Sequence, residues 1–115
     1  MSASYLRWGA FVLVAGLVMY GIFRPIPPEM LFEQSDKVGH IGAFLVLALT
    51  GRMAMNRLSA VSFWLMMLIL AVFLEYLQGE FRPFRVFSLA DVVANGSGVL
   101  LALCVYTIRG RLRAA

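Results

Sequence analysis

Residues 58–78 read LSAVSFWLMMLILAVFLEYLQ and contain no charged side chain before Glu75. At ~1.5 Å of rise per residue, a helix of this length crosses the ~30 Å hydrocarbon core of a bilayer. The stretch therefore predicts a transmembrane helix. Glu75 and Gln78 lie three residues apart near its end, so both are expected on one face of that helix.

Three further apolar segments accompany this one, at residues 6–23, 36–53 and 86–108. The chain has 115 residues, of which 62% are hydrophobic and 14% charged, and its mean hydropathy is +0.86. This composition excludes a soluble globular domain and indicates a small helical membrane protein. We predict a single domain over residues 1–115, all-α, forming an integral membrane four-helix bundle.

The basic residues predict how the bundle is oriented. If the four segments cross the membrane in turn, six arginines lie on one side and four basic residues on the other. The first group is Arg7, Arg52, Arg57, Arg109, Arg111 and Arg113, and the second is Arg24, Lys37, Arg82 and Arg85. Since cytoplasmic loops carry the excess of positive charge, both termini are expected in the cytoplasm.

Three pairs of polar residues interrupt the apolar segments. The pairs are Asp36 with His40, Glu75 with Gln78, and Asp91 with Asn95. Each pair is three or four residues apart, and a charged group inside a membrane is costly unless it faces protein or water. We expect the pairs to line one polar pocket near the outer ends of the second, third and fourth helices.

The residue types leave several functions open, because carboxylates, one imidazole and guanidinium groups could bind an anionic headgroup, relay protons or hold helices together. The candidate ligand-binding residues are Asp36, Lys37, His40, Glu75, Gln78, Arg82, Arg85, Asp91 and Asn95. If the protein is an enzyme, the candidates for catalysis are His40, Asp36, Glu75 and Asp91. In that interpretation Asp36 orients His40 as a general base.

No metal and no other cofactor is expected. The carboxylates and His40 could surround a divalent cation, but the His-x-x-x-Asp/Glu spacing of metal-binding helices is missing. Arg82 or Arg85 would also compete for the carboxylates, since either could pair with Asp91 or Glu75 or bind the phosphate of a headgroup. The basic residues form no stripe, so no nucleic-acid partner is expected either.

Small residues predict which helices touch. Asn95-Gly96-Ser97-Gly98 in the last segment, and Gly39, Gly42 and Ala43 in the second, permit close backbone approach. We therefore expect the second and fourth helices to be in contact. Phe63, Trp64 and the Met66-Met67 pair are expected to face lipid or the membrane interface.

Four short motifs together resemble the VanZ-like membrane protein family. They are Asp36-Lys37-x-x-His40, Glu75-x-x-Gln78, Arg85 with five residues before Asp91, and Asn95-x-x-Gly98. The resemblance runs from Asp36 to about Leu101 and implies a multi-pass protein of the bacterial plasma (inner) membrane. The family namesake is associated with resistance to teicoplanin, a lipid-bearing glycopeptide antibiotic. The chain departs from the family pattern in being short and in carrying Arg82-Pro83-Phe84 where a glycine-rich turn is usual.

The resemblance implies a cell-envelope protein that binds or shields a lipid-linked or lipid-bearing ligand at the outer face of the membrane. That ligand would be a teicoplanin-like glycopeptide or a cell-wall lipid precursor, and membrane lipids are the expected surroundings. One alternative is a small intramembrane hydrolase or transferase acting on a phosphate-linked lipid. Another is a purely structural assembly partner. Four short helices bury little surface, so a homo-oligomer is also consistent with the sequence.

Overall fold

The computed structural model describes residues 2–24, 35–81 and 87–114. These residues form four α-helices and no strand. The helices are α1 (Ala3–Phe23), α2 (Ser35–Ala54), α3 (Ala60–Phe81) and α4 (Leu89–Ala114). The predicted all-α, four-helix architecture is confirmed. Two of the predicted site residues, Arg82 and Arg85, lie outside the described residues.

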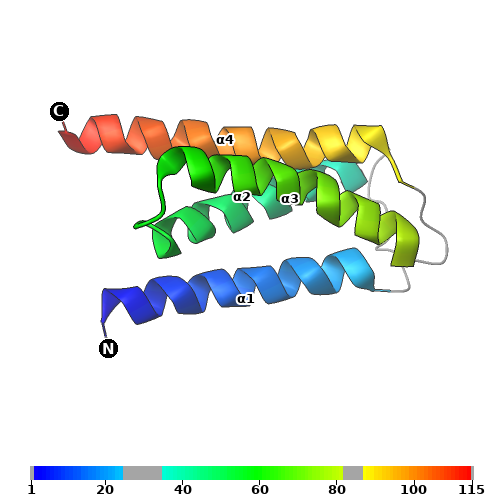
Figure 1. The fold of residues 1–115 in the computed structure, drawn as a ribbon, viewed down its shortest axis with the longest axis horizontal. Helices are drawn as coiled ribbons and strands as arrows, with labels where there is room; N and C mark the ends of the chain where they lie inside the picture. Colours follow the sequence, from blue (N-terminus) through cyan, green and yellow to red (C-terminus); the bar gives the residue numbers. More distant parts are fainter. Residues whose placement is uncertain (1, 25–34, 82–86, 115) are drawn as a thin grey trace.

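The helices run side by side along the length of the molecule (Figure 1). α2 lies between α1 and α4 and packs against both, while α3 packs mainly on α4. The start of α1 and the end of α4 share one end of the bundle (Figure 1). The starts of α2 and α4 and the ends of α1 and α3 gather at the other end. We call this second end the site end.

The predicted contact between α2 and α4 is present, and it is the most extensive one between the described helices. Gly98 makes it possible, because a Cβ at this position would collide with the carbonyl oxygen of Ile41 and press on Phe44. The other glycines expected to take part do not: a Cβ built on Gly39, Gly42 or Gly96 meets nothing within 4 Å. The helix pair was predicted correctly, but Gly98 alone provides its closest approach.

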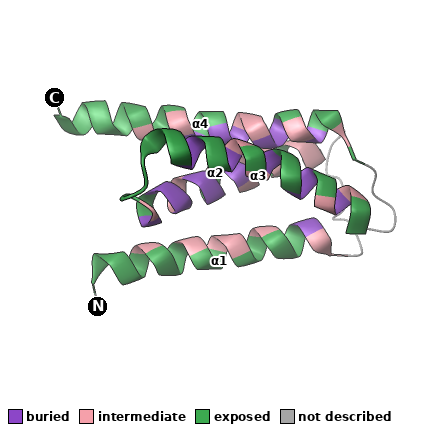
Figure 2. Ribbon diagram, viewed as in Figure 1, coloured by how far each residue is buried: buried purple, intermediate pink, exposed green. Residues whose placement is uncertain are grey.

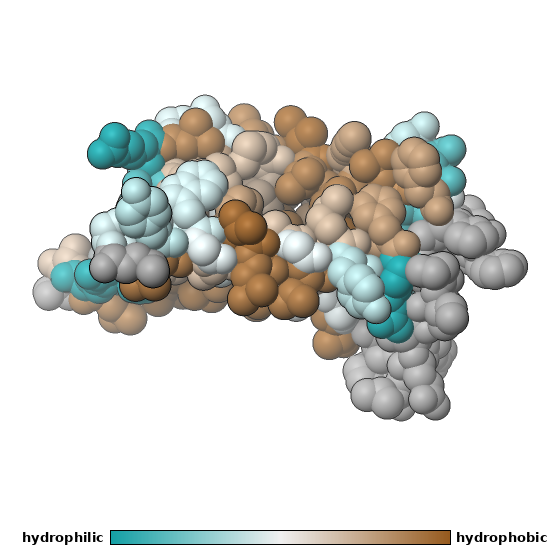
Figure 3. Space-filling model, turned by 90° about the horizontal axis from the view of Figure 1, so that it is seen from below, coloured by the Kyte–Doolittle hydropathy of each residue, from teal (hydrophilic) through white to brown (hydrophobic). Residues whose placement is uncertain are grey.

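Apolar side chains fill the space between the helices and also cover much of the outside. The buried faces of α2, α3 and α4 turn toward one another, whereas α1 is mostly exposed (Figure 2). Brown, apolar side chains cover the middle of the face shown in Figure 3, with hydrophilic groups toward its ends. An apolar outer belt of this kind suits the hydrocarbon interior of a bilayer.

The expected lipid-facing role of the aromatic residues on α3 was wrong in part. Phe63, Trp64 and Met67 belong to the buried core, and only Met66 of that group is exposed. Hydropathy identifies an apolar helix but not which of its faces meets protein, because lipid and a protein core accept the same side chains. Hydrophobic residues are spread almost uniformly around the axis of α3, so the sequence gives little indication of which face is buried.

Three of the described helices, α1, α3 and α4, are long and apolar enough to cross a membrane. The fourth predicted span, α2, does not reach that standard of composition. Its first turns carry Asp36, Lys37 and His40, and its last turn carries Arg52. α2 is nevertheless central in the bundle, with Phe44 and Ala48 almost fully buried. At its ends, Arg52 is buried, whereas Asp36 and Lys37 stay partly exposed.

Arg52 closes the end of the bundle opposite the site. Its guanidinium donates hydrogen bonds to the backbone carbonyls of Met55 (3.3 Å) and Leu58 (2.8 Å), in the turn between α2 and α3. It also lies over the rings of Phe63 and Tyr106, 5.5 and 5.7 Å from their centroids. Because Arg52 is buried, it is a structural cap of the turn.

Candidate functional site

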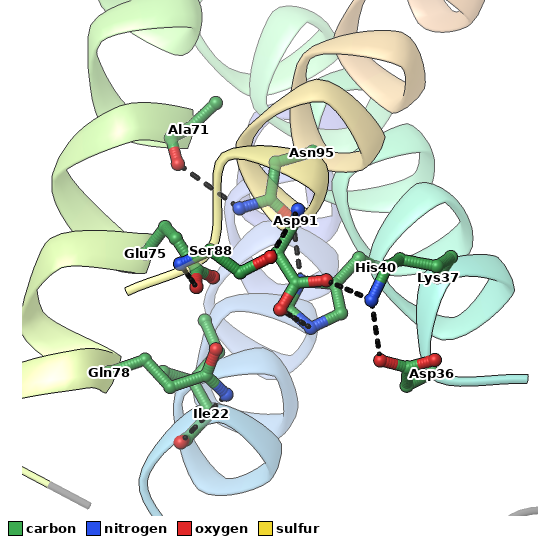
Figure 4. A network of polar contacts seen from close by, with 10 residues as sticks. All are labelled: Ile22, Asp36, Lys37, His40, Ala71, Glu75, Gln78, Ser88, Asp91 and Asn95. Carbon is green, nitrogen blue, oxygen red and sulfur yellow. Dashed lines mark hydrogen bonds and ion pairs between the residues drawn. The ribbon is translucent and has the colours of Figure 1, made fainter. Parts of the chain in front are cut away.

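Polar side chains from α2, α3 and α4 meet inside the site end of the bundle (Figure 4). Glu75, Asp91 and Asn95 each have only 1% of their surface exposed. His40 is partly buried beside them, and Lys37 and Asp36 form the more open side, with side-chain exposures of 29% and 26%. We call these six residues the polar cluster. Buried ionisable groups of this kind mark functional positions in membrane proteins.

The start of α4 fixes the position of Asp91. Ser88 immediately precedes the helix, and its hydroxyl accepts a hydrogen bond from the backbone N–H of Asp91 (3.2 Å). This is the usual N-cap arrangement, and it satisfies one of the unpaired donors of the first helical turn. The backbone N–H of Ser88 donates in turn to Oε1 of Glu75 (3.1 Å). The cap therefore joins α3 to α4 beside the cluster.

Close packing keeps this junction tight. A Cβ on Gly79 would lie 2.8 Å from the backbone nitrogen of Phe87, so no larger residue fits without displacing the chain. Gly79 is four residues after Glu75 on α3, and Phe87 directly precedes Ser88. The glycine thus lets the segment before α4 approach α3 closely enough for the bond between Ser88 and Glu75.

Asn95 sets the orientation of His40. The Asn95 amide nitrogen donates to the backbone carbonyl of Ala71 on α3 (3.1 Å), which turns its Oδ1 toward α2. That oxygen lies 2.7 Å from Nδ1 of His40. Because an amide oxygen can only accept, Nδ1 of His40 carries the hydrogen in this bond. In the neutral imidazole, Nε2 then bears the lone pair, and it faces Oδ2 of Asp91 at 4.0 Å.

Lys37 connects the exposed part of the polar cluster to its buried part through two ion pairs. Its ammonium lies 2.9 Å from Oδ2 of Asp36 and 2.8 Å from Oδ1 of Asp91. The pair with Asp91 stabilises a carboxylate that is withdrawn from solvent. It also leaves the two Asp91 oxygens with different neighbours, since Oδ1 faces Lys37 and Oδ2 faces His40.

Gln78 links the cluster to α1. Its amide nitrogen donates to the backbone carbonyl of Ile22 (3.2 Å), and the residue is 3% exposed. Figure 4 shows its oxygen turned toward Glu75. Within the described part of the chain, that oxygen receives no hydrogen bond. An amide oxygen withdrawn from water is an acceptor suited to a ligand or ion.

One ligand atom each from His40, Glu75 and Asp91 lies within 4.8 Å of the others. An imidazole and two carboxylates at this separation can share a proton or hold a cation. The same arrangement could take up a proton from a bound hydroxyl or water. The chemistry available is therefore proton transfer, cation binding, or hydrogen bonding to a polar head.

The structure brings together most of the residues expected from the sequence. Lys37, His40, Glu75, Asp91 and Asn95 meet, with Asp36 attached through Lys37 and Gln78 one turn along α3 from Glu75. One expected pairing differs: among the described residues, Asn95 rather than Asp36 holds the ring of His40. Lys37 is a cation on Asp91 that the sequence did not predict. The possible pair of Arg85 with Asp91 falls outside the described residues.

Sequence reasoning missed the backbone partners of the cluster, which are the carbonyls of Ile22 and Ala71. Backbone acceptors leave no mark in a sequence, because every residue supplies one. The role of Ser88 was detectable. It lies three residues before Asp91 at the start of an apolar run, which is the spacing of a helix cap.

These features define a small helical membrane protein with a buried polar cluster at one end of its bundle. The chain belongs to the VanZ/LLP1 family, whose model matches residues 8–110. The family resemblance expected from the sequence is thereby confirmed. Comparison with curated proteins finds no match, and comparison with solved structures finds none either.

Proposed function

We propose that this protein binds the polar head of a lipid-linked or lipid-bearing ligand at the outer face of the bacterial plasma membrane. The head would enter the polar cluster from its open side, and the apolar part would stay in the bilayer beside the helices. A glycopeptide of the teicoplanin type and a cell-wall lipid precursor both have this two-part character. The orientation, with both termini in the cytoplasm, is part of the proposal.

The burial of the cluster is the observation that carries this proposal. Three helices each place ionisable or amide groups at one end of an otherwise apolar bundle, where such groups cost several kcal/mol unless they have protein or ligand partners. Lys37 and Asp36 make the cluster accessible from one side. They are therefore the residues that would meet the head of the ligand first.

Binding to the purified full-length chain in lipid nanodiscs tests this proposal. The probes are teicoplanin and a polyprenyl-phosphate-linked cell-wall precursor, with vancomycin as the glycopeptide that lacks a lipid tail. Wild type is expected to bind one of the two lipid-bearing probes at least about tenfold more tightly than vancomycin, a difference of about 1.4 kcal/mol. Equal binding of all three, or none, contradicts the proposal.

Two matched variants locate the binding in the cluster. Lys37→Gln removes a positive charge from its open side, and Arg57→Gln removes one from the exposed turn at the opposite end. Because a hydrogen bond to a charged group contributes ~1.5–3 kcal/mol, Lys37→Gln is expected to weaken binding about tenfold or more. Arg57→Gln is expected to bind like wild type. Equal effects of the two variants would place the ligand elsewhere.

A second candidate function is an intramembrane hydrolase or transferase acting on a phosphate-linked lipid. The orientation of His40 favours it, because the bond to Asn95 leaves Nε2 directed at the interior of the cluster. There it could accept a proton from water or a hydroxyl. Incubation with a polyprenyl-phosphate-linked substrate, followed by mass spectrometry, tests this candidate. Product from wild type and none from His40→Gln supports it, whereas an unchanged substrate with wild type rejects it.

A further inference from the structure

We infer that His40, Glu75 and Asp91 form a binding site for one divalent transition-metal ion of the Zn²⁺ type. Each comes from a different helix, and their ligand atoms lie within 4.8 Å of one another in the interior of the site end. Ligand atoms at ~2.0–2.2 Å from one ion lie no more than ~4.4 Å apart, so a small inward movement of the side chains completes the site. This inference does not depend on the proposed lipid ligand.

His40 is prepared as a metal ligand by Asn95. Metal-binding histidines usually donate their second ring N–H to a protein acceptor, which fixes the tautomer and the ring orientation. Nδ1 of His40 makes this bond to Oδ1 of Asn95 at 2.7 Å, and Asn95 is itself held by the carbonyl of Ala71. Nε2 is consequently the nitrogen that coordinates the ion.

Asp91 presents one oxygen to the same place. Its Oδ2 lies 4.0 Å from Nε2 of His40, which is too long for a hydrogen bond but short enough for both atoms to bind one ion. Its Oδ1 is 2.8 Å from the ammonium of Lys37. Lys37 then supports the Asp91 ligand from outside the site, where its ion pair with Oδ1 orients the carboxylate.

Glu75 and Gln78 complete the site from α3. The backbone N–H of Ser88 holds Oε1 of Glu75 and so orients its carboxylate. Gln78 provides an independent indication of a ligand. Its amide oxygen is buried, turned toward Glu75, and receives no hydrogen bond within the described residues, while its nitrogen is fixed on Ile22 (Figure 4).

The set of donors selects the class of ion. One imidazole with two carboxylates suits Zn²⁺ and similar transition ions better than Mg²⁺ or Ca²⁺, which prefer oxygen ligands alone. Three protein ligands also leave a coordination position open, as in zinc sites that bind water or substrate. A phosphate or carboxyl group on a ligand could occupy that position.

Metal content of the purified full-length chain tests the inference. The protein is stripped with a chelator in nanodiscs, dialysed against Zn²⁺, washed, and measured by mass spectrometry for zinc per chain. Wild type is expected to hold about one ion. Glu75→Gln and Asp91→Asn are expected to lose most of it, whereas Glu80→Gln, the same change at an exposed position of α3, retains it. The proposed metal site is rejected if wild type holds no zinc, or if Glu75→Gln and Asp91→Asn hold as much zinc as wild type.

X-ray absorption at the zinc edge keeps the test valid if either variant fails to fold. Wild type is expected to show one imidazole and oxygen neighbours at ~2.0–2.2 Å. A sulfur neighbour at ~2.3 Å would assign the ion to the exposed Cys104 and reject the site. No lipid ligand is present in either measurement. Failure of the metal site therefore leaves the proposed ligand binding standing, and failure of ligand binding leaves the metal site standing.

Discussion

A single amide, that of Asn95, connects three helices and decides the chemistry of His40. It donates to Ala71 on α3 and accepts from His40 on α2, while belonging to α4. The sequence identified both residues, because polar groups in apolar segments are rare and noticeable. It did not pair them, since they are 55 positions apart and their contact depends on how two helices are rotated.

Replacing Asn95 by leucine, which has a similar shape, is expected to destabilise the protein by about 1–3 kcal/mol. The change leaves Nδ1 of His40 and the carbonyl of Ala71 without their buried partner. Thermal unfolding in detergent measures the effect. Ser97→Ala is the control, since within the described residues the Ser97 hydroxyl donates to Val93 of its own helix and to no other helix, and a change within about 0.5 kcal/mol is expected there. Equal stability of the two variants would contradict the bridging role of Asn95.

For the helices, the sequence predicted their lengths and their type, but not how each helix is rotated about its own axis. The apolar segments indicated four helices, and α4 extends beyond its predicted end because Arg109, Arg111 and Arg113 are good helix formers that suit a helix C-terminus. Which faces meet could not be read from the pattern. Phe63 and Trp64 proved to be core residues, and only one of the candidate glycines lies at the closest approach of α2 and α4.

Gly98→Ala is expected to destabilise the bundle by about 1–3 kcal/mol, because the added methyl group collides with the backbone of α2 at Ile41. Gly96→Ala is the matched control two residues away. Its new Cβ meets nothing within 4 Å, so alanine is expected to be neutral or to stabilise the helix by up to about 1 kcal/mol. Membrane abundance and melting temperature report both changes. A Gly98→Ala protein as stable as Gly96→Ala would refute the close contact.

For the molecule as a whole, composition predicted a membrane bundle, and the family match agrees with it. Composition predicted four spans, whereas α1, α3 and α4 are the described helices long and apolar enough to cross a membrane, because α2 carries Asp36, Lys37 and His40 near its start and Arg52 in its last turn. The predicted orientation rests on the distribution of basic residues, and Arg52, one of the six arginines predicted to be cytoplasmic, is buried against the α2–α3 turn. A sequence shows how many charged residues lie in a loop, but not which of them are buried against other parts of the protein.

Cysteine labelling in intact cells tests the orientation. In a Cys104→Ser background, Leu89→Cys places a thiol at the site end, and Ala114→Cys places one at the opposite end. A membrane-impermeant maleimide is expected to label Leu89→Cys in intact cells and Ala114→Cys only after lysis. The reverse pattern would put the polar cluster on the cytoplasmic side and exclude an extracellular ligand.

We propose above all that the polar cluster is a functional site, and that its residues do more than hold the helices together. Teicoplanin and vancomycin susceptibility of a sensitive strain tests it, with wild type, His40→Ala, Asp91→Asn and the control Ser97→Ala compared at measured membrane abundance. We predict teicoplanin-selective protection by wild type and Ser97→Ala, lost in the two cluster variants at equal abundance. An abundant wild type that gives no such protection, or cluster variants that protect equally well, would contradict the account.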